Sequence, residues 1–186
     1  MHTVEYSPIT EEDLDLVLAF TDKWIGKNYY QKEELAQIIQ QGHKCNLNAS
    51  VKACVGGELA GIRLTLAPGS WIKETSEGLS LSKWNIPEGD VAYFKSLFVS
   101  EKFQKLGIGK ELSKRSIDIL KKMNAAGILC HSWLESPGNS SQKYLLSMGF
   151  KEVRQHQKFW SQIDYLCTRC SPKKCACTAA EMLKLL

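Results

Sequence analysis

The stretch Leu97-Phe98-Val99-Ser100-Glu101-Lys102-Phe103-Gln104-Lys105-Leu106-Gly107-Ile108-Gly109 decides how this chain of 186 residues is expected to fold. It begins inside an apolar segment, residues 90–100, in which both alternating faces are hydrophobic. That pattern is typical of a strand buried on both sides. The stretch ends at the start of a helix predicted over residues 108–124, with apolar residues at helical spacing. A buried strand is therefore expected to lead through a glycine turn into a helix.

The glycine turn predicts an anion site. The first turn of a helix carries unpaired N–H groups and the positive end of the helix dipole. Gly107 and Gly109 lack a Cβ, so an anion can come close to the main chain, and Lys105 and Lys110 add positive charge. The third glycine of a dinucleotide fingerprint is missing, and no P-loop lysine follows at the right spacing.

The segments around this turn predict a mixed sheet with helices packed on it. We expect strands at residues 3–6, 50–55, 59–66, 128–134 and 150–160, and helices at 10–24, 31–41 and 139–149. Residues 68–89 form a long polar segment that could border a functional site or pack on the surface. This order of elements predicts an α+β fold of the three-layer type.

The composition excludes several classes of function. The residues are 44% hydrophobic and 24% charged, which suits one globular domain. The net charge is +4, and the sequence shows no basic stripe of the kind found in nucleic-acid-binding proteins. No signal peptide and no membrane span are predicted, since a basic start with an apolar run and a stretch of about 18 apolar residues are both missing. We therefore expect a cytoplasmic protein whose seven cysteines are thiols or metal ligands.

Two motifs together resemble the GCN5-related N-acetyltransferase (GNAT) superfamily. Gln104, Gly107 and Gly109 match its Arg/Gln-x-x-Gly-x-Gly/Ala turn, and Leu97 and Val99 match the strand before it. The segment 139–150 resembles the family's later helix, which ends in Gly-Phe and leads to a strand. On this resemblance, residues 1–160 are the acetyltransferase domain, and residues 161–186 are a cysteine-rich tail packed on the same domain.

The resemblance implies a splayed mixed sheet flanked by helices, with acetyl-CoA bound in the gap between two central strands. The pantetheine arm would pair with the main chain around Leu97 and Val99, and the amides of the turn would hold the pyrophosphate. The residues expected to bind the cofactor are Leu97, Phe98, Val99, Gln104, Lys105, Leu106, Gly107, Ile108, Gly109, Lys110 and Asn139.

The family's direct attack of an amine on the thioester requires a base for the amine proton and an acid for the leaving thiolate. Tyr144 is the candidate acid, although the family's tyrosine position, counted from the Gly-Phe pair, is occupied by Leu145. Lys95 stands where some members carry a glutamate base. The candidate bases are Glu88 and Asp90, with Glu135, His131 or a water chain as alternatives. Cys130 is interpreted as a core thiol.

Four cysteines in eleven residues, Cys167, Cys170, Cys175 and Cys177, predict a structural zinc site. An iron–sulfur cluster, a disulfide or a metal-free tail are the alternatives. A helix is expected over residues 179–186, where it could cover the core or the partner subunit of a homodimer.

The sequence thus favours transfer of an acetyl group from acetyl-CoA to a primary amine of a small molecule or peptide. An acyl-CoA sensor without catalysis, or a metal or thiol sensor acting through the tail, are the alternatives. Five aromatic residues would suit a cationic amine if they face the acceptor pocket: Trp24, Tyr29, Tyr30, Trp71 and Trp84.

Overall fold

The computed structural model describes residues 3–24, 27–72, 78–162, 167 and 169–186. Four helices are present in this part of the chain: α1 (Leu14–Trp24), α2 (Lys32–Gln41), α3 (Ile108–Lys122) and α4 (Ser140–Ser147). The strands are β1 (Val4–Pro8), β2 (His43–Lys44), β3 (Leu47–Asn48), β4 (Val51–Val55), β5 (Glu58–Leu66), β6 (Val91–Val99), β7 (Gly127–Trp133), β8 (Lys151–His156) and β9 (Ala179–Leu185).

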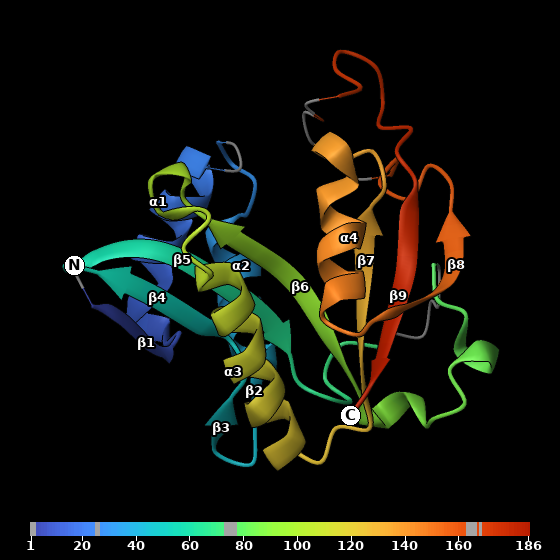
Figure 1. Ribbon diagram of the computed structural model, residues 1–186, viewed down its shortest axis with the longest axis horizontal. Helices are drawn as coiled ribbons and strands as arrows, with labels where there is room; N and C mark the ends of the chain where they lie inside the picture. The colour runs from blue at the N-terminus through green and yellow to red at the C-terminus, as the bar shows by residue number, and fades with distance from the viewer. Residues whose placement is uncertain (1–2, 25–26, 73–77, 163–166, 168) are drawn as a thin grey trace.

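Seven of the described strands form one mixed sheet in the order β1-β4-β5-β6-β7-β9-β8. Every neighbouring pair is antiparallel except β6 and β7, which are parallel. The α+β fold predicted from the sequence, a mixed sheet flanked by helices, is confirmed (Figure 1).

The two parallel strands separate soon after they begin, as Figure 1 shows. Their pairing covers Val91–Tyr93 of β6 and Gly127–Leu129 of β7 only. The register of β6 against β5 shifts at the same point, because Leu64 pairs with Ser96 and Thr65 pairs with Phe94. Lys95 is therefore the extra residue of a β-bulge. A bulge bends its strand and increases the local twist, which directs β6 away from β7.

The helices cover both faces of the sheet. Leu35 and Ile39 of α2 pack with Ile62 and Leu64 of β5 on one face. On the other face, Leu112 of α3 packs against β4 and β5, and a second group of core residues joins α3 and α4 to β6, β7 and β9. No helix among the described residues has the length and apolar character needed to cross a bilayer.

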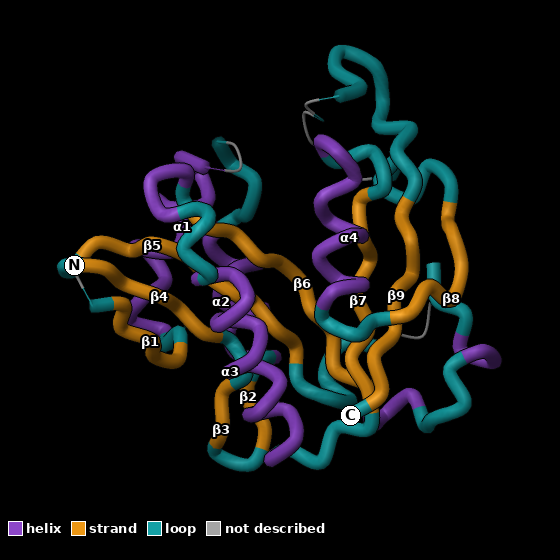
Figure 2. Tube along the Cα trace, in the orientation of Figure 1, coloured by secondary structure: helices purple, strands orange, loops and turns teal. Residues whose placement is uncertain are grey.

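The C-terminal segment corrects one expectation. Residues Ala179–Leu185 form strand β9 between β7 and β8, and not a helix. The apolar run from Met182 to Leu183 suits a strand that is buried on both faces, and burial between two partners outweighs helix propensity. The short β2–β3 hairpin was not predicted. The described part of the connection between β5 and β6 contains two 3-10 turns, Leu81–Lys83 and Glu88–Asp90 (Figure 2).

Candidate functional site

The separation of β6 from β7 leaves one edge of β6 without a strand partner among the described residues. Beyond Tyr93, β6 still pairs with β5 on its other side, up to Val99 opposite Gly61. Main-chain groups of residues 96–99 on this edge are therefore placed to pair with an extended ligand, as a further strand would, although the Val99 carbonyl already accepts from Gln104 Nε2. Leu97 and Val99, predicted to bind the pantetheine arm, lie on this segment.

The glycine turn has the conformation that an anion site requires. Gly107 is the residue before α3 and has a φ of 78°, a left-handed conformation that favours glycine. No side chain caps the helix, and the Glu111 amide donates to the Gly107 carbonyl at 3.1 Å, so the amides of the first turn before it have no main-chain partner inside the helix. The side-chain amide of Gln104 donates through Nε2 to the Val99 carbonyl at 3.1 Å and so closes the turn. This arrangement fits a pyrophosphate.

The start of α4 lies on the same face as α3 and contributes two predicted residues. The Tyr144 hydroxyl lies 2.7 Å from Ser113 Oγ and 3.1 Å from the Gly109 carbonyl, so it joins the two helices. Asn139 donates to Gln142, but its Oδ1 atom is buried with no hydrogen-bond partner among the described residues. An unpartnered buried acceptor of this kind fits contact with a ligand donor.

A cavity of about 320 Å³ lies on the α2 face of the sheet, at the point where β6 and β7 separate. Its size is in the range of small-molecule sites. The residues around it come from α2, β5, β6, β7 and the two long connections: Glu34, Gln37, Ile38, Gln41, Leu66, Trp71, Ile72, Leu79, Tyr93, Lys95, His131 and Phe159.

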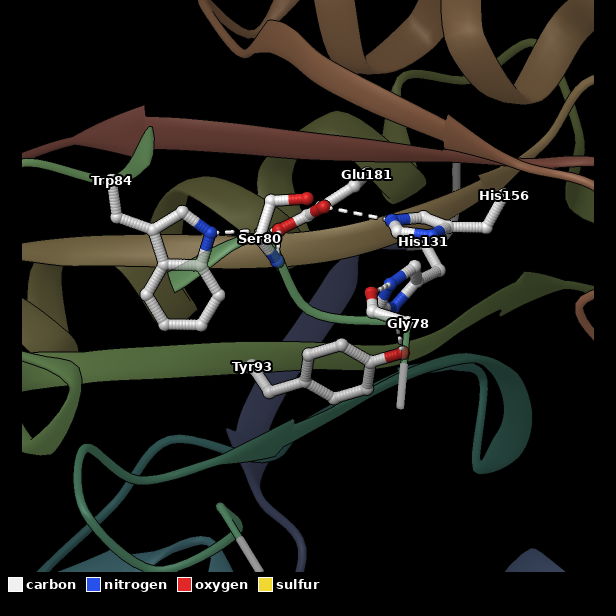
Figure 3. Close-up of polar contacts among 7 residues, drawn as sticks. All are labelled: Gly78, Ser80, Trp84, Tyr93, His131, His156 and Glu181. Atoms are coloured by element: carbon white, nitrogen blue, oxygen red, sulfur yellow. Dashed lines mark hydrogen bonds and ion pairs between the residues drawn. The ribbon is translucent and has the colours of Figure 1, made fainter. Parts of the chain in front are cut away.

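Tyr93 and His131 form a hydrogen-bonded pair in the wall of this cavity. The Tyr93 hydroxyl lies 3.0 Å from His131 Nδ1, and His131 Nε2 lies 2.8 Å from the Gly78 carbonyl (Figure 3). A carbonyl only accepts, so Nε2 carries the hydrogen of the neutral ring. Nδ1 is then the acceptor of the hydrogen bond that the Tyr93 hydroxyl donates.

Burial keeps both members of the pair uncharged. It lowers the pKa of His131 from 6.5 to about 4, against the opposing effect of the Gly78 contact. Burial also raises the pKa of Tyr93 well above its usual value. The Phe159 ring stacks on the imidazole at 4.3 Å between centroids, and the Trp71 ring lies 4.8 Å from that of Tyr93. At neutral pH the site therefore offers an uncharged imidazole whose Nδ1 lone pair accepts the hydrogen bond of the Tyr93 hydroxyl.

A second network fixes the wall behind this pair. Glu181 of β9, opposite His131 in register, is fully buried. Its carboxylate accepts from the Ser80 amide at 2.9 Å, the Trp84 indole at 2.7 Å and His156 Nε2 at 2.8 Å (Figure 3). Burial by itself raises the pKa of Glu181, but these donors lower it below its ordinary value. The carboxylate thus anchors residues 80–84 against the sheet.

Two buried groups lie near the same point but on the α3 face. Arg63 is 2% exposed, donates to Ser113 Oγ and lies 4.1 Å over the Phe94 ring. Burial lowers its pKa. Burial raises the pKa of Cys130 to about 11, so this residue is a neutral thiol at neutral pH, in keeping with the prediction of a core thiol.

Other predicted residues lie elsewhere. Glu88 and Asp90 are in the 3-10 turn before β6, where β6 and β7 are still paired, and they do not line the cavity. Glu135 accepts from the Thr178 amide. Of the five aromatic residues considered for the acceptor pocket, Trp71 is in its wall, whereas Tyr30 and Trp84 are core residues.

Sequence reasoning missed Tyr93 as a site residue and considered His131 only as one of several bases. Their contact depends on the register of two parallel strands whose paired residues are 36 positions apart in sequence, as in the pair Tyr93–Leu129. A tyrosine and a histidine near the ends of two buried strands were the available signal, and this pattern alone does not fix the register.

Four cysteines lie together in the connection between β8 and β9. The sulfur atoms of Cys167, Cys170, Cys175 and Cys177, named here the cysteine cluster, all lie within 4.8 Å of one another. No disulfide, which is the alternative raised from the sequence, joins these four cysteines in the structure. Four thiols so placed could hold a metal ion.

The comparisons with known proteins agree with this geometry. The model of the acetyltransferase (GNAT) family matches residues 16–150, and the chain therefore belongs to the GNAT family. A search of curated protein sequences found no significant match.

Solved structures with the same fold include three acetyltransferases. Arabidopsis thaliana NAA60 in complex with acetyl-CoA has a TM-score of 0.71 and 17% identity, over 99% of both chains. Arabidopsis thaliana Naa50 with the bisubstrate analogue CoA-Ac-MVNAL has a TM-score of 0.67 and 15% identity, over 98% of this chain and 99% of that one. The Escherichia coli ribosomal-protein-S18-alanine N-acetyltransferase has a TM-score of 0.67 and 15% identity, over 98% and 94%.

Proposed function

We propose that this protein transfers an acetyl group from acetyl-CoA to a primary amine by direct attack, with Tyr93 and His131 accepting the amine proton. The observation that carries the proposal is the position of this pair. It lies in the wall of the cavity, at the point where the unpaired edge of β6 begins. A cofactor arm laid along that edge would bring its thioester to the cavity.

The chain's own groups would position acetyl-CoA in three places. The amides at the start of α3, with Lys105 and Lys110, would hold the pyrophosphate. The main chain of residues 96–99 would pair with the pantetheine arm, and Asn139 would contact the cofactor from α4. The cofactor supplies the activated acetyl group, and the cavity on the opposite face would admit the amine.

The proton path follows from the hydrogen-bond directions. When the amine nitrogen bonds to the thioester carbon, it becomes a strong acid and must lose a proton. The Tyr93 oxygen would take this proton while the tyrosine's own proton moves to His131 Nδ1 at 3.0 Å. The imidazolium formed in this way would then release its extra proton to water, since the pKa of His131 is about 4, and the pair would be restored for the next turnover. Collapse of the adduct then breaks the carbon–sulfur bond and forms the amide.

The leaving thiolate requires a proton, and Tyr144 is the candidate donor. Its hydroxyl lies between α3 and α4, on the face opposite the cavity, where the cofactor arm would pass. The buried cation of Arg63, bonded to the same Ser113, would favour transient negative charge nearby. Cys130 takes no part, since its thiol stays protonated and direct attack needs no acyl-enzyme.

The acyl-CoA sensor is the main competing interpretation. It was motivated by two departures from the family: Lys95 stands where some members have a glutamate base, and Tyr144 lies one position before the family's tyrosine. The Tyr93–His131 pair offers another base two residues away on the same strand, so Lys95 no longer argues against catalysis.

Two measurements test the proposal. Calorimetric titration with acetyl-CoA should give saturable binding, and CoA release should rise on adding amines from a panel of polyamines, amino acids and short peptides. Binding without amine-dependent release would favour the sensor. If acetyl-CoA fails to bind at millimolar concentration, both interpretations fail.

A further inference from the structure

The spacing of the sulfur atoms in the cysteine cluster matches one particular ligand geometry. Zinc–thiolate bonds of about 2.3 Å in a tetrahedron place the sulfurs about 3.8 Å apart. Cys177 Sγ lies 3.8 Å from Cys167 Sγ and 3.6 Å from Cys170 Sγ, and all four sulfurs lie within 4.8 Å. In a multi-iron cluster the four thiolates are divided among two or more iron atoms. Thiolate sulfurs on different irons must then lie farther apart than those on a single ion. The arrangement therefore fits a single ion.

The surroundings of the cluster suit a negatively charged tetrathiolate. The Ala176 amide points at Cys170 Sγ at 3.4 Å, so a main-chain donor already faces a sulfur atom. Lys173 and Lys174 are exposed in the turn between the two pairs of cysteines, where their charge offsets that of a metal with four thiolates. Three of the four cysteines are buried, beside Trp133 and Trp160. Such a site has no open position for a substrate.

The cluster is joined directly to the cavity through Phe159. The Phe159 amide donates to the Cys177 carbonyl at 3.1 Å, so its backbone is fixed to a cluster residue. Its ring stacks on the His131 imidazole at 4.3 Å and packs closely against Gly78, whose carbonyl holds His131 Nε2. Phe159 thus contacts both His131 and the residue that sets its tautomer.

We propose that the cysteine cluster binds one zinc ion, and that this closed site holds Phe159 in place over His131. Loss of the ion would release the Phe159 ring from its place, uncover the imidazole and let water reach it. Phe159 is then a positioning residue, and the metal has no direct part in the reaction. The relevance to catalysis rests on the proposed function, whereas metal binding and the exposure of His131 can be measured without acetyl-CoA.

Metal analysis of the purified full chain tests the first half of the proposal. Under reducing conditions we expect about one zinc per chain. After removal of the metal with a strong chelator, Co²⁺ should restore the visible absorption of tetrahedral cobalt thiolate, and Zn²⁺ should displace it. Cys170→Ser should weaken the cobalt titration by at least about tenfold. Cys45→Ser, the same change at an exposed cysteine outside the cluster, should leave the titration unchanged.

Several results would overturn this half. A wild-type chain that binds Co²⁺ no more tightly than Cys170→Ser contradicts the site. One iron per chain in place of zinc contradicts the choice of metal. An equal loss in Cys45→Ser would show that the effect is not specific to the cluster.

Acylation of histidines by diethylpyrocarbonate, mapped by mass spectrometry, tests the second half. His131 should react severalfold faster in the metal-free chain than in the zinc-loaded chain, while the exposed His43 serves as the reference in the same digest. Zinc-loaded Phe159→Ala should show the fast His131 rate with its metal retained. If His131 in zinc-loaded Phe159→Ala reacts as slowly as in the zinc-loaded wild-type chain, Phe159 does not cover His131 and the proposed coupling is wrong. This variant also decides the matter if removal of the metal loosens the whole chain.

Discussion

The Tyr93 hydroxyl donates to Nδ1 of His131 across the point where β6 and β7 separate, at 3.0 Å. The two strands are parallel neighbours for only three residue pairs, and the hydrogen bond lies just beyond the last of them. The Gly78 carbonyl, on the other side of the ring, fixes the tautomer that makes this bond possible.

Removing either member of the pair should reduce turnover. We expect Tyr93→Phe and His131→Gln each to lower kcat by about 100-fold, since general base catalysis typically contributes at least this much. The glutamine amide can still donate to the Gly78 carbonyl, but it has no acceptor at the position of Nδ1. Steady-state kinetics with the best amine from the panel measures the effect.

The double variant separates a relay from two independent roles. If the two groups act as one unit, Tyr93→Phe with His131→Gln should be no slower than the slower single variant. Multiplied losses would contradict the relay. Tyr6→Phe, a change on β1 outside the cavity wall, should leave kcat within about twofold of wild type.

The conformation of Gly107 should matter for acetyl-CoA binding. Gly107→Ala imposes a left-handed φ of 78° on a residue with a Cβ, which costs about 1 kcal/mol of stability, and should weaken acetyl-CoA binding by about tenfold. Gly57→Ala is the matched control, because Gly57 has a φ of 80° and equally open space around it but lies in the β4–β5 turn. Urea unfolding should show equal destabilisation of the two variants. Calorimetric titration with acetyl-CoA should show an unchanged affinity in the Gly57→Ala control. Equal affinities in both variants would contradict the anion site.

Stability should depend on pH through His131. Its pKa is about 4 in the folded chain and 6.5 in the unfolded chain, so between these values the unfolded chain binds the extra proton. The stabilisation is therefore present above pH 6.5 and is lost as the pH falls towards 4. Urea unfolding at several pH values should show this slope in the wild type, and a flatter one in His131→Gln. Parallel curves would contradict the buried neutral imidazole.

The carboxylate of Glu181 should be important for stability. Glu181→Gln removes the charge that faces His156 and leaves buried donors poorly matched, at a cost of about 2 kcal/mol in the free energy of unfolding. Glu111→Gln breaks a surface pair with Arg115 and should cost under about 0.5 kcal/mol. Equal effects of the two substitutions in urea unfolding would contradict the role assigned to Glu181.

Much of the fold could be predicted from local pattern. The buried strand β6, the glycine turn and α3 follow from apolar periodicity and from a left-handed position that only glycine occupies easily. The strand β9 could not be assigned locally, because a short apolar run suits a buried strand or a helix equally. Its place between β7 and β8 depends on long-range pairing.

The cofactor half and the proton-handling half of the candidate site also differed in how far the local sequence could predict them. The cofactor half is one continuous stretch, so its residues and spacing are visible in the sequence. The Tyr93–His131 pair depends on a bulge at Lys95 and on the register of parallel strands, and neither is encoded by a short motif. The cysteines were visible by spacing, but their contact with Phe159 was not.

The most direct test of amine acetylation by the Tyr93–His131 pair is mass spectrometry of an amine panel incubated with acetyl-CoA and either the wild-type chain or His131→Gln. We expect the wild-type chain to yield an N-acetylated product from at least one amine, at a rate about 100-fold above that of the variant. Equal rates of product formation by the two proteins, or no acetylated amine although acetyl-CoA binds, would contradict it.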